Sequence, residues 1–203
     1  MKFLLAATLM LVLSAMAIAV PDSQQLGPYS VSFDMNTDLP HQIMVSEPIQ
    51  AQSATFYSMQ IFTDNTTKAI LTVSEYANPI DSTQGLYKQI AVMNMALNGF
   101  NTTNVEDKII TGKEGFLISG VPFPGNTIIP ADAKLFNALC WMDSQGCECG
   151  AVSVGTTSVD ITSSYPQDVT ESLLSSLQIV KGGATSSALP APSTQGGQVL
   201  PPE

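Results

Sequence analysis

The sequence contains no arginine and few charges of either sign, which restricts the partners it can have. Its 203 residues include 7 lysines against 17 aspartates and glutamates, for a formal net charge of −10. Nucleic-acid binding requires clustered Lys and Arg to neutralise phosphates, so we expect no nucleic-acid partner. Hydrophobic residues still make up 44 % of the chain, which is typical of a folded protein rather than a disordered one.

The residues that most often carry catalysis are also scarce. The sole histidine, His41, follows Leu39 and Pro40 in a predicted loop, where we expect a structural role rather than that of a general base. The adjacent acids Glu106 and Asp107 lack the spacing of a calcium loop. No Walker loop, dinucleotide fingerprint, H-E-x-x-H or G-x-S-x-G motif is present. We therefore predict a protein that is not an enzyme and has no cofactor or bound metal.

The one long apolar run lies at the N-terminus, from Phe3 to Val20. It follows Lys2 and contains Ala17-Ile18-Ala19, the A-x-A pattern of a secretory cleavage site. A membrane anchor is the alternative, because the run is close to the shortest that spans a bilayer. Its small residues and the following Pro21 favour a signal peptide over residues 1–19. We predict a secreted or cell-surface protein with no membrane insertion after cleavage.

The C-terminal end differs in composition from the rest of the chain. From Gly182 onward the sequence reads GGATSSALPAPSTQGGQVLPPE, which offers little apolar surface to bury. We predict a disordered tail over residues 182–203, serving either as a frayed end or as a spacer. A single domain over residues 20–181 remains.

Alternating apolar and polar residues predict strands, first from Tyr29 to Met35. Strands at 57–61 and 68–76 flank the turn-like sequence DNTT and indicate a hairpin. Further strands are predicted at 108–111, 115–119, 134–142 and 147–156.

Two helices are predicted from apolar residues at helical spacing. The first runs from Asp81, a candidate N-cap, to Gly99, a residue suited to a helix end. Its predicted core-facing residues are Leu86, Ile90, Met93 and Leu97. The second begins near Pro166, which suits the first helical position. Its predicted core-facing residues are Val169, Leu173 and Leu177.

Hairpins combined with two well-separated helices indicate an α+β fold, an antiparallel sheet covered by two main helices. The opening YSVSFDMN, the hairpin ATFYSMQIF…KAILTVSEY and the closing YPQDVTESLLSSLQIVK follow one another in an order that resembles the PsbP-like family. The resemblance covers residues 29–181 and implies an α/β/α sandwich. It also implies an adaptor or assembly factor without a catalytic apparatus, and it assigns no functional residue.

Three cysteines, Cys140, Cys147 and Cys149, lie within the sequence CWMDSQGCECG. If the DSQG turn closes a hairpin, Cys140 lies opposite Cys149 on one face of a sheet. Opposed Cβ atoms are ~4.5–5.5 Å apart, close to the spacing in a disulfide. We predict a disulfide between Cys140 and Cys149, with Cys147 as a candidate intermolecular thiol. Alternatively, the cysteines are small buried apolar residues, or they bind a metal with a fourth ligand.

Two sequons, Asn65-Thr66-Thr67 and Asn101-Thr102-Thr103, fall in predicted turns. Because the chain is rich in Ser and Thr, two sequons are no more than chance provides. Asn65 and Asn101 are therefore glycosylation candidates on account of their placement alone.

The leader, the acidity, the Ser/Thr richness and the Pro-containing tail are similar to those of surface proteins of methanogenic archaea, such as sheath or surface-layer subunits. We expect a structural envelope protein that associates with itself, or with other envelope proteins, through strand edges and disulfides. The alternative is an extracellular, non-catalytic binding or accessory module. Its groove would lie between the sheet and the first helix, with Phe116, Phe123 and Trp141 as candidate lining residues, although we expect a buried core role for each of the three.

Overall fold

The computed structural model describes residues 21–82, 84–143, 145–146 and 153–182. Strands make up 54 % and helices 16 % of this part of the chain, so the protein is mostly β. Both of its sheets are antiparallel. None of the helices in the described part of the chain is long and apolar enough to cross a membrane.

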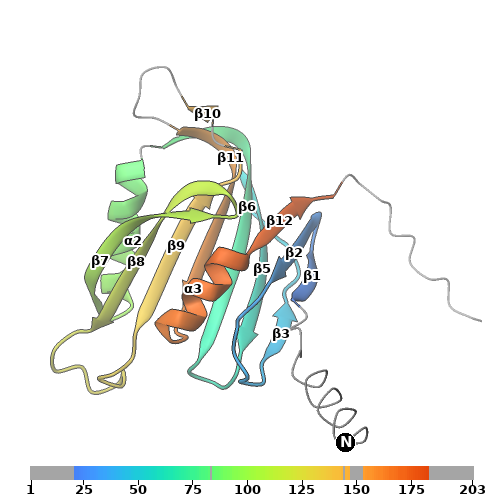
Figure 1. The fold of residues 1–203 in the computed structure, drawn as a ribbon. Helices are drawn as coiled ribbons and strands as arrows, with labels where there is room; N and C mark the ends of the chain where they lie inside the picture. The colour runs from blue at the N-terminus through green and yellow to red at the C-terminus, as the bar shows by residue number, and fades with distance from the viewer. Residues whose placement is uncertain (1–20, 83, 144, 147–152, 183–203) are drawn as a thin grey trace, which may run out of the picture.

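The smaller sheet has three strands in the order β1-β2-β12. Their bounds are β1 Asp22–Leu26, β2 Tyr29–Phe33 and β12 Gln178–Lys181. The N-terminal hairpin therefore pairs with the last described strand, and the two ends of the domain meet in one sheet (Figure 1).

The larger sheet contains nine described strands. Seven of them follow the order β3-β5-β6-β11-β9-β8-β7, while β4 pairs with β5 and β10 with β11. Their bounds are β3 Gln42–Val45, β4 Ile49–Gln50, β5 Ala54–Phe62, β6 Lys68–Ser82, β7 Phe100–Ile110, β8 Lys113–Pro122, β9 Leu135–Trp141, β10 Gln145–Gly146 and β11 Ser153–Ser163. This sheet is the scaffold on which the other elements pack.

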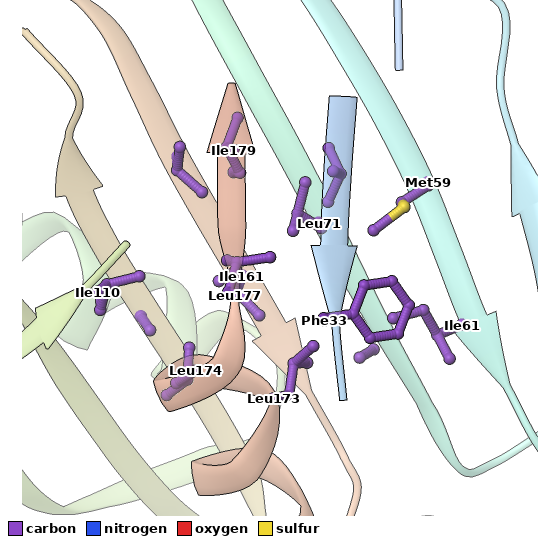
Figure 2. Close-up of a cluster of buried hydrophobic side chains, with 14 of the residues drawn as sticks. Phe33, Met59, Ile61, Leu71, Ile110, Ile161, Leu173, Leu174, Leu177 and Ile179 are labelled. Carbon is purple, nitrogen blue, oxygen red and sulfur yellow. The ribbon is translucent and has the colours of Figure 1, made fainter. Parts of the chain in front are cut away.

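The main core lies between the larger sheet and a layer formed by the smaller sheet and helix α3 (Gln167–Ser176) (Figures 1 and 2). Phe33 of β2 and Leu173 of α3 are almost fully buried in it, as are residues of β5, β6 and β11. The labelled side chains in Figure 2 converge from both layers, among them Ile61, Leu71 and Ile161. Burial of this apolar surface is what holds the two layers together.

Helix α2 (Gln84–Leu97) packs on the other face of the larger sheet, at its β7–β9 end. Ala91 and Met95 contact Phe116 and Ile118 in a second, smaller core. The same face farther along the sheet carries hydroxyl side chains, including a Ser58–Thr72 hydrogen bond of 2.9 Å. One face of the sheet is therefore covered by α2 over part of its width only.

The predicted α+β fold, with a sheet covered by two main helices in an α/β/α sandwich, is wrong. The protein is mostly β, and one of the layers on the larger sheet is itself a three-stranded sheet with α3 attached. The helical spacing of apolar residues after residue 81 predicted a longer helix that faces the core with those residues, whereas α2 covers only part of one face of the larger sheet. Met93 and Leu97 are 56 % and 78 % exposed, so the predicted apolar stripe does not face the core.

Several elements predicted from the sequence are confirmed. The first strand, the hairpin around DNTT and the helix after Pro166 all form, and Val169, Leu173 and Leu177 are buried as expected. Gly99 follows α2 with a φ of +85°, as a helix-ending glycine does. Asp81 is not an N-cap, because β6 continues through Ser82.

The predicted signal peptide, residues 1–19, lies outside the described residues. The predicted tail, residues 182–203, does so as well except for Gly182, whose amide N–H donates to the Pro28 carbonyl at 2.8 Å. Both therefore stay predictions.

Candidate functional site

The densest polar cluster that joins the two sheets is centred on Glu75 of β6. The Tyr29 phenol of β2 donates to Oε1 of Glu75 at 2.6 Å, and the Tyr57 phenol of β5 donates to Oε2 at 3.3 Å. Lys181 of β12 forms an ion pair with Oε1. Tyr29 and Lys181 are cross-strand partners in the smaller sheet, which is why both reach the same carboxylate.

Aromatic contacts reinforce this cluster. The Tyr29 and Tyr57 ring centroids are 5.7 Å apart in an edge-to-face arrangement, and the Lys181 ammonium lies 5.7 Å from the Tyr29 ring. Tyr57 also lies against Gly27, where a Cβ atom would come within 2.3 Å of the ring. The turn between β1 and β2 therefore needs a residue without a side chain at this position.

The pKa values of the cluster are perturbed by burial and by its charges. Burial raises the pKa of Tyr29, and the hydrogen bond and negative charge of Glu75 raise it further. Burial acts to raise the pKa of Glu75, but Lys181 and Tyr29 outweigh it and the pKa is lowered. At neutral pH the carboxylate is therefore ionised and the phenol protonated, which is the pairing that the geometry shows.

A cavity of about 370 Å³ lies beside Glu75. It is lined mainly by small and polar side chains, among them Ser53, Thr55, Thr156 and Lys181. The carboxylate oxygens already accept bonds from three donors, which suits positioning of a polar molecule better than proton transfer. The cavity is not the apolar groove expected of a binding module.

A second polar group, Asp160 of β11, lies beneath α2. The Asn137 amide donates to its two carboxylate oxygens at 3.4 and 3.3 Å, and to the Thr162 hydroxyl at 3.2 Å. Burial raises the pKa of Asp160, and the bonds from Asn137 and Thr162 oppose this shift only in part. These residues border a cavity of about 160 Å³ with Asn94 and Asn98 of α2.

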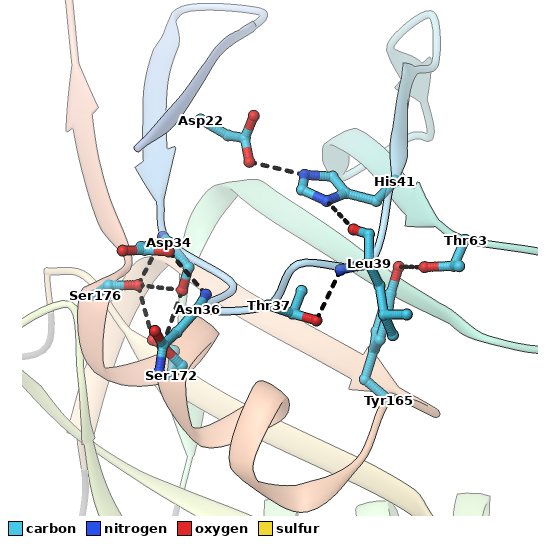
Figure 3. Close-up of polar contacts among 10 residues, drawn as sticks. All are labelled: Asp22, Asp34, Asn36, Thr37, Leu39, His41, Thr63, Tyr165, Ser172 and Ser176. Atoms are coloured by element: carbon cyan, nitrogen blue, oxygen red, sulfur yellow. Dashed lines mark hydrogen bonds and ion pairs between the residues drawn. The ribbon is translucent and has the colours of Figure 1, made fainter. Parts of the chain in front are cut away.

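His41 joins two segments of the chain, and its expected structural role stays a prediction. Its Nε2 lies 2.8 Å from a carboxylate oxygen of Asp22, and its Nδ1 lies 3.4 Å from the Leu39 carbonyl (Figure 3). The contact ties β1 to the segment that leads into β3.

A second set of polar contacts joins α3 to the end of β2. Ser172 and Ser176 of α3 donate to the Asp34 carbonyl at 3.2 and 3.0 Å (Figure 3).

Cys140 is fully buried in the main core on β9. Its cross-strand partners are Val159 on β11 and Gly115 on β8, so the predicted hairpin register that set Cys140 opposite Cys149 is wrong. Burial raises the pKa of the Cys140 thiol to about 11. Cys147 and Cys149 lie outside the described residues, and the disulfide and the intermolecular thiol stay predictions.

The two glycosylation candidates are both exposed. Asn65 lies in the loop between β5 and β6, where Asp64 accepts hydrogen bonds from Thr66 and Thr67. Asn101 lies within β7, opposite Val121, rather than in the predicted turn.

The three aromatic residues proposed to line a groove are not brought together. Phe116 is fully buried under α2, and Trp141 is 6 % exposed with its ring between those of Tyr76 and Tyr87. Phe123 is 41 % exposed. The expected core role is therefore confirmed for Phe116 and Trp141 and is wrong for Phe123, and the three do not line a common groove.

The larger sheet ends in an edge strand on each side. Among the described strands, β7 pairs with β8 alone and β3 with β5 alone. Val105 and Ile109 of β7 are 41 % and 60 % exposed, and Met44 next to the other end is 49 % exposed. Apolar side chains therefore accompany both open edges.

The described residues thus define a mostly β protein with a large antiparallel sheet open at both ends, a polar cluster between its sheets, and a partial helical cover. In comparisons with family models, curated proteins and solved structures, none matches this chain. The likeness to PsbP-like and methanogen surface proteins therefore rests on the sequence pattern alone.

Sequence reasoning missed the Glu75 and Asp160 sites entirely. Tyr29 and Lys181 lie 46 and 106 positions from Glu75, and no local motif links them. The available signal was an acidic residue within each of two predominantly uncharged strands, Glu75 in β6 and Asp160 in β11, and such a residue does not by itself indicate its partner.

Proposed function

We propose that this chain is a secreted structural protein of the cell envelope, a sheath or surface-layer-associated subunit that assembles through the edges of its larger sheet. The observation that carries the proposal is the 11-residue edge strand β7, which has a described partner on one side only. An unpaired edge presents a row of N–H and C=O groups on which another chain can add a strand.

The acidity of the chain bears on how such assembly can occur. A net charge of −10 makes copies repel one another at low salt, so non-specific association is suppressed. Contacts between copies, or with other envelope proteins, must then come from specific hydrogen bonds and matched charges. The predicted leader supports an extracellular location, and catalysis has no part in the proposal.

Cell fractionation tests the location and non-reducing electrophoresis the cross-links. We expect the native protein in the envelope fraction, with a mass that corresponds to loss of residues 1–19. Oligomers that collapse on reduction, and that weaken in Cys147→Ser, would support a covalent contribution. Recovery from the cytosol with the leader attached would contradict the proposal.

A second candidate function, a non-catalytic extracellular binding or accessory module, is favoured by one observation. The cavity of about 370 Å³ beside Glu75 offers an ionised carboxylate, a lysine and several hydroxyls to a small polar molecule. Thermal unfolding of the wild type and Glu75→Gln with panels of amino acids and oligosaccharides tests it. A ligand-dependent rise in Tm that the variant lacks would support binding at this cavity, and the lack of any rise would contradict it.

A further inference from the structure

We propose that β7 pairs antiparallel with β7 of a second copy, about a two-fold axis that passes through Asp107. This inference deepens the proposed function and rests on it, because it names the partner of one open edge. Three features of β7 support it: which of its backbone N–H and C=O groups point away from β8, the length of its regular segment, and the order of its charged residues.

The hairpin turn sets which backbone groups of β7 face outward. Thr111 and Gly112 form a two-residue turn with φ values of 52° and 74°, both positive as a type I′ turn requires. Ile110 and Lys113 are therefore the first hydrogen-bonded pair, and such pairs alternate along an antiparallel ladder. The N–H and C=O groups of Glu106 and Lys108 point to β8, whereas those of Val105, Asp107 and Ile109 point to the open edge.

The regular part of β7 is symmetric about Asp107. A β-bulge interrupts the register between Thr102 and Asn104, and the turn begins after Ile110. The uninterrupted segment is 104–110, and its central residue is Asp107. Two copies that pair antiparallel about this residue overlap along the whole segment, and their outward-facing groups meet in hydrogen-bonded pairs.

This register also matches the charges. Glu106 lies opposite Lys108 of the second copy, and Lys108 lies opposite Glu106 of the second copy, so two ion pairs form by symmetry. Moving the axis by one residue would set Glu106 opposite itself or Lys108 opposite itself, and directly opposed like charges are destabilising. In the single copy these two side chains are 3.9 Å apart on one face and 42 % and 28 % exposed, so both are available to a second chain.

The other face of the strand is compatible with the same axis. Val105 lies opposite Ile109 of the second copy, and both side chains are exposed and apolar in the single copy. Asp107 faces itself across the axis, but its carboxylate is already neutralised by Lys88 of α2 at 2.6 Å. Pairing therefore buries apolar surface on the α2 side and pairs Glu106 with Lys108 on the other side, while Lys88 supplies the counter-charge to Asp107 within each copy.

A charge-swap series measured by sedimentation velocity tests the register on the full chain. We expect the wild type to dimerise, and Glu106→Lys and Lys108→Glu each to raise the dissociation constant about tenfold or more. An equimolar mixture of the two variants should form a heterodimer, because each variant supplies the charges that the other lacks. The double variant E106K/K108E should dimerise like the wild type.

Val105→Pro provides an independent measurement, because it removes an outward N–H and leaves the bonds to β8 intact. It should abolish the dimer while the circular dichroism spectrum stays unchanged. If the wild type associates but the swaps and the mixture have no effect, the β7 register is overturned while assembly through another surface stands. If the wild type is monomeric at every concentration, both the register and the assembly proposal fail.

Discussion

Tyr29 and Glu75 are joined by a hydrogen bond of 2.6 Å from phenol to Oε1, although 46 positions separate them in the chain. The bond connects β2 of the smaller sheet to β6 of the larger one. Tyr29 is 1 % exposed, so a phenol without an acceptor at this place would be costly. The pair therefore fixes how the two sheets lie on each other.

Tyr29→Phe is expected to change the stability of the protein at high pH. Because the pKa of Tyr29 is raised in the folded state, the folded state retains its proton longer than the unfolded one. The stability from this phenol is present below about pH 10, the ordinary tyrosine pKa, and is lost as pH rises above it. Between pH 8 and pH 11 the free energy of unfolding, measured with urea, should therefore fall less in the variant than in the wild type.

At neutral pH the same variant should unfold more easily by about 1–3 kcal/mol, because the Glu75 carboxylate loses a buried donor. Tyr76→Phe is the matched control, since the Tyr76 ring packs against Trp141 with centroids 5.8 Å apart. If the free energy of unfolding falls with rising alkaline pH equally in both variants and the wild type, Tyr29 is not the cause of that pH dependence.

Two methionines on α2 should respond very differently to truncation. Met95 is 2 % exposed and packs with Phe116 and Ile118, whereas Met93 is 56 % exposed. Met95→Ala should lower the free energy of unfolding by about 2–5 kcal/mol, because it leaves a cavity. Met93→Ala should change it by less than about 0.5 kcal/mol. Chemical denaturation of the pair measures both, and equal losses would mean that α2 is rotated from the orientation described here.

Replacing Asp160 by Asn should have an effect that depends on pH. Because burial raises the pKa of Asp160, its contribution is full below about pH 4, the ordinary value, and is lost as pH rises through the raised pKa. Between about pH 4 and pH 7 the wild type therefore loses stability that the uncharged Asn side chain does not lose, so at pH 7 Asp160→Asn should be at least as stable as the wild type. At pH 3 that advantage should disappear, as thermal unfolding at the two pH values can show.

Asp143→Asn is the matched control, because the pKa of Asp143 is lowered in the folded state whereas that of Asp160 is raised. Burial acts to raise the pKa of Asp143, but the Thr156 hydroxyl and the amide N–H groups of Thr156 and Thr157 lower it overall. Its stabilising effect is present above about pH 4 and lost as pH falls. This variant should be less stable than the wild type at pH 7, with a difference that shrinks in acid. The same pH trend in both variants would contradict these assignments.

Gly27→Ala should destabilise the junction of the two sheets. Gly27 has a φ of +59°, and an added Cβ would lie 2.3 Å from Tyr57 ring atoms. Gly112 has a φ of +74° but open space around it, so Gly112→Ala isolates the backbone strain, roughly 1–2 kcal/mol. Gly27→Ala should cost about 1–3 kcal/mol more, because Tyr57 must move. If urea denaturation gives the same loss of unfolding free energy for Gly27→Ala and Gly112→Ala, the Tyr57 ring moves aside at no cost.

Local pattern predicted the parts of the fold that depend on neighbouring residues. The period-two segment at Tyr29, the DNTT hairpin and α3 with Leu173 and Leu177 on its buried side all follow from spacing, turn residues and a proline at a helix start. In α2 the same reasoning selected the wrong face. Leu86, Ile90, Met93 and Leu97 are the more apolar set, but Ala91 and Met95 are small or flexible enough to lie close to the sheet.

By itself the sequence determined that this is an acidic, arginine-free chain with strand-forming segments in its middle, and it predicted a leader over residues 1–19. Composition and periodicity are properties of the chain before it folds, and they bound its partners and its local elements. Only the tertiary structure decided that β12 returns to pair with β2, that Glu75 meets Tyr29 and Lys181, and that β7 ends the sheet. These depend on pairings between strands far apart in sequence, which are selected by shared burial and complementary hydrogen bonds that no local pattern encodes.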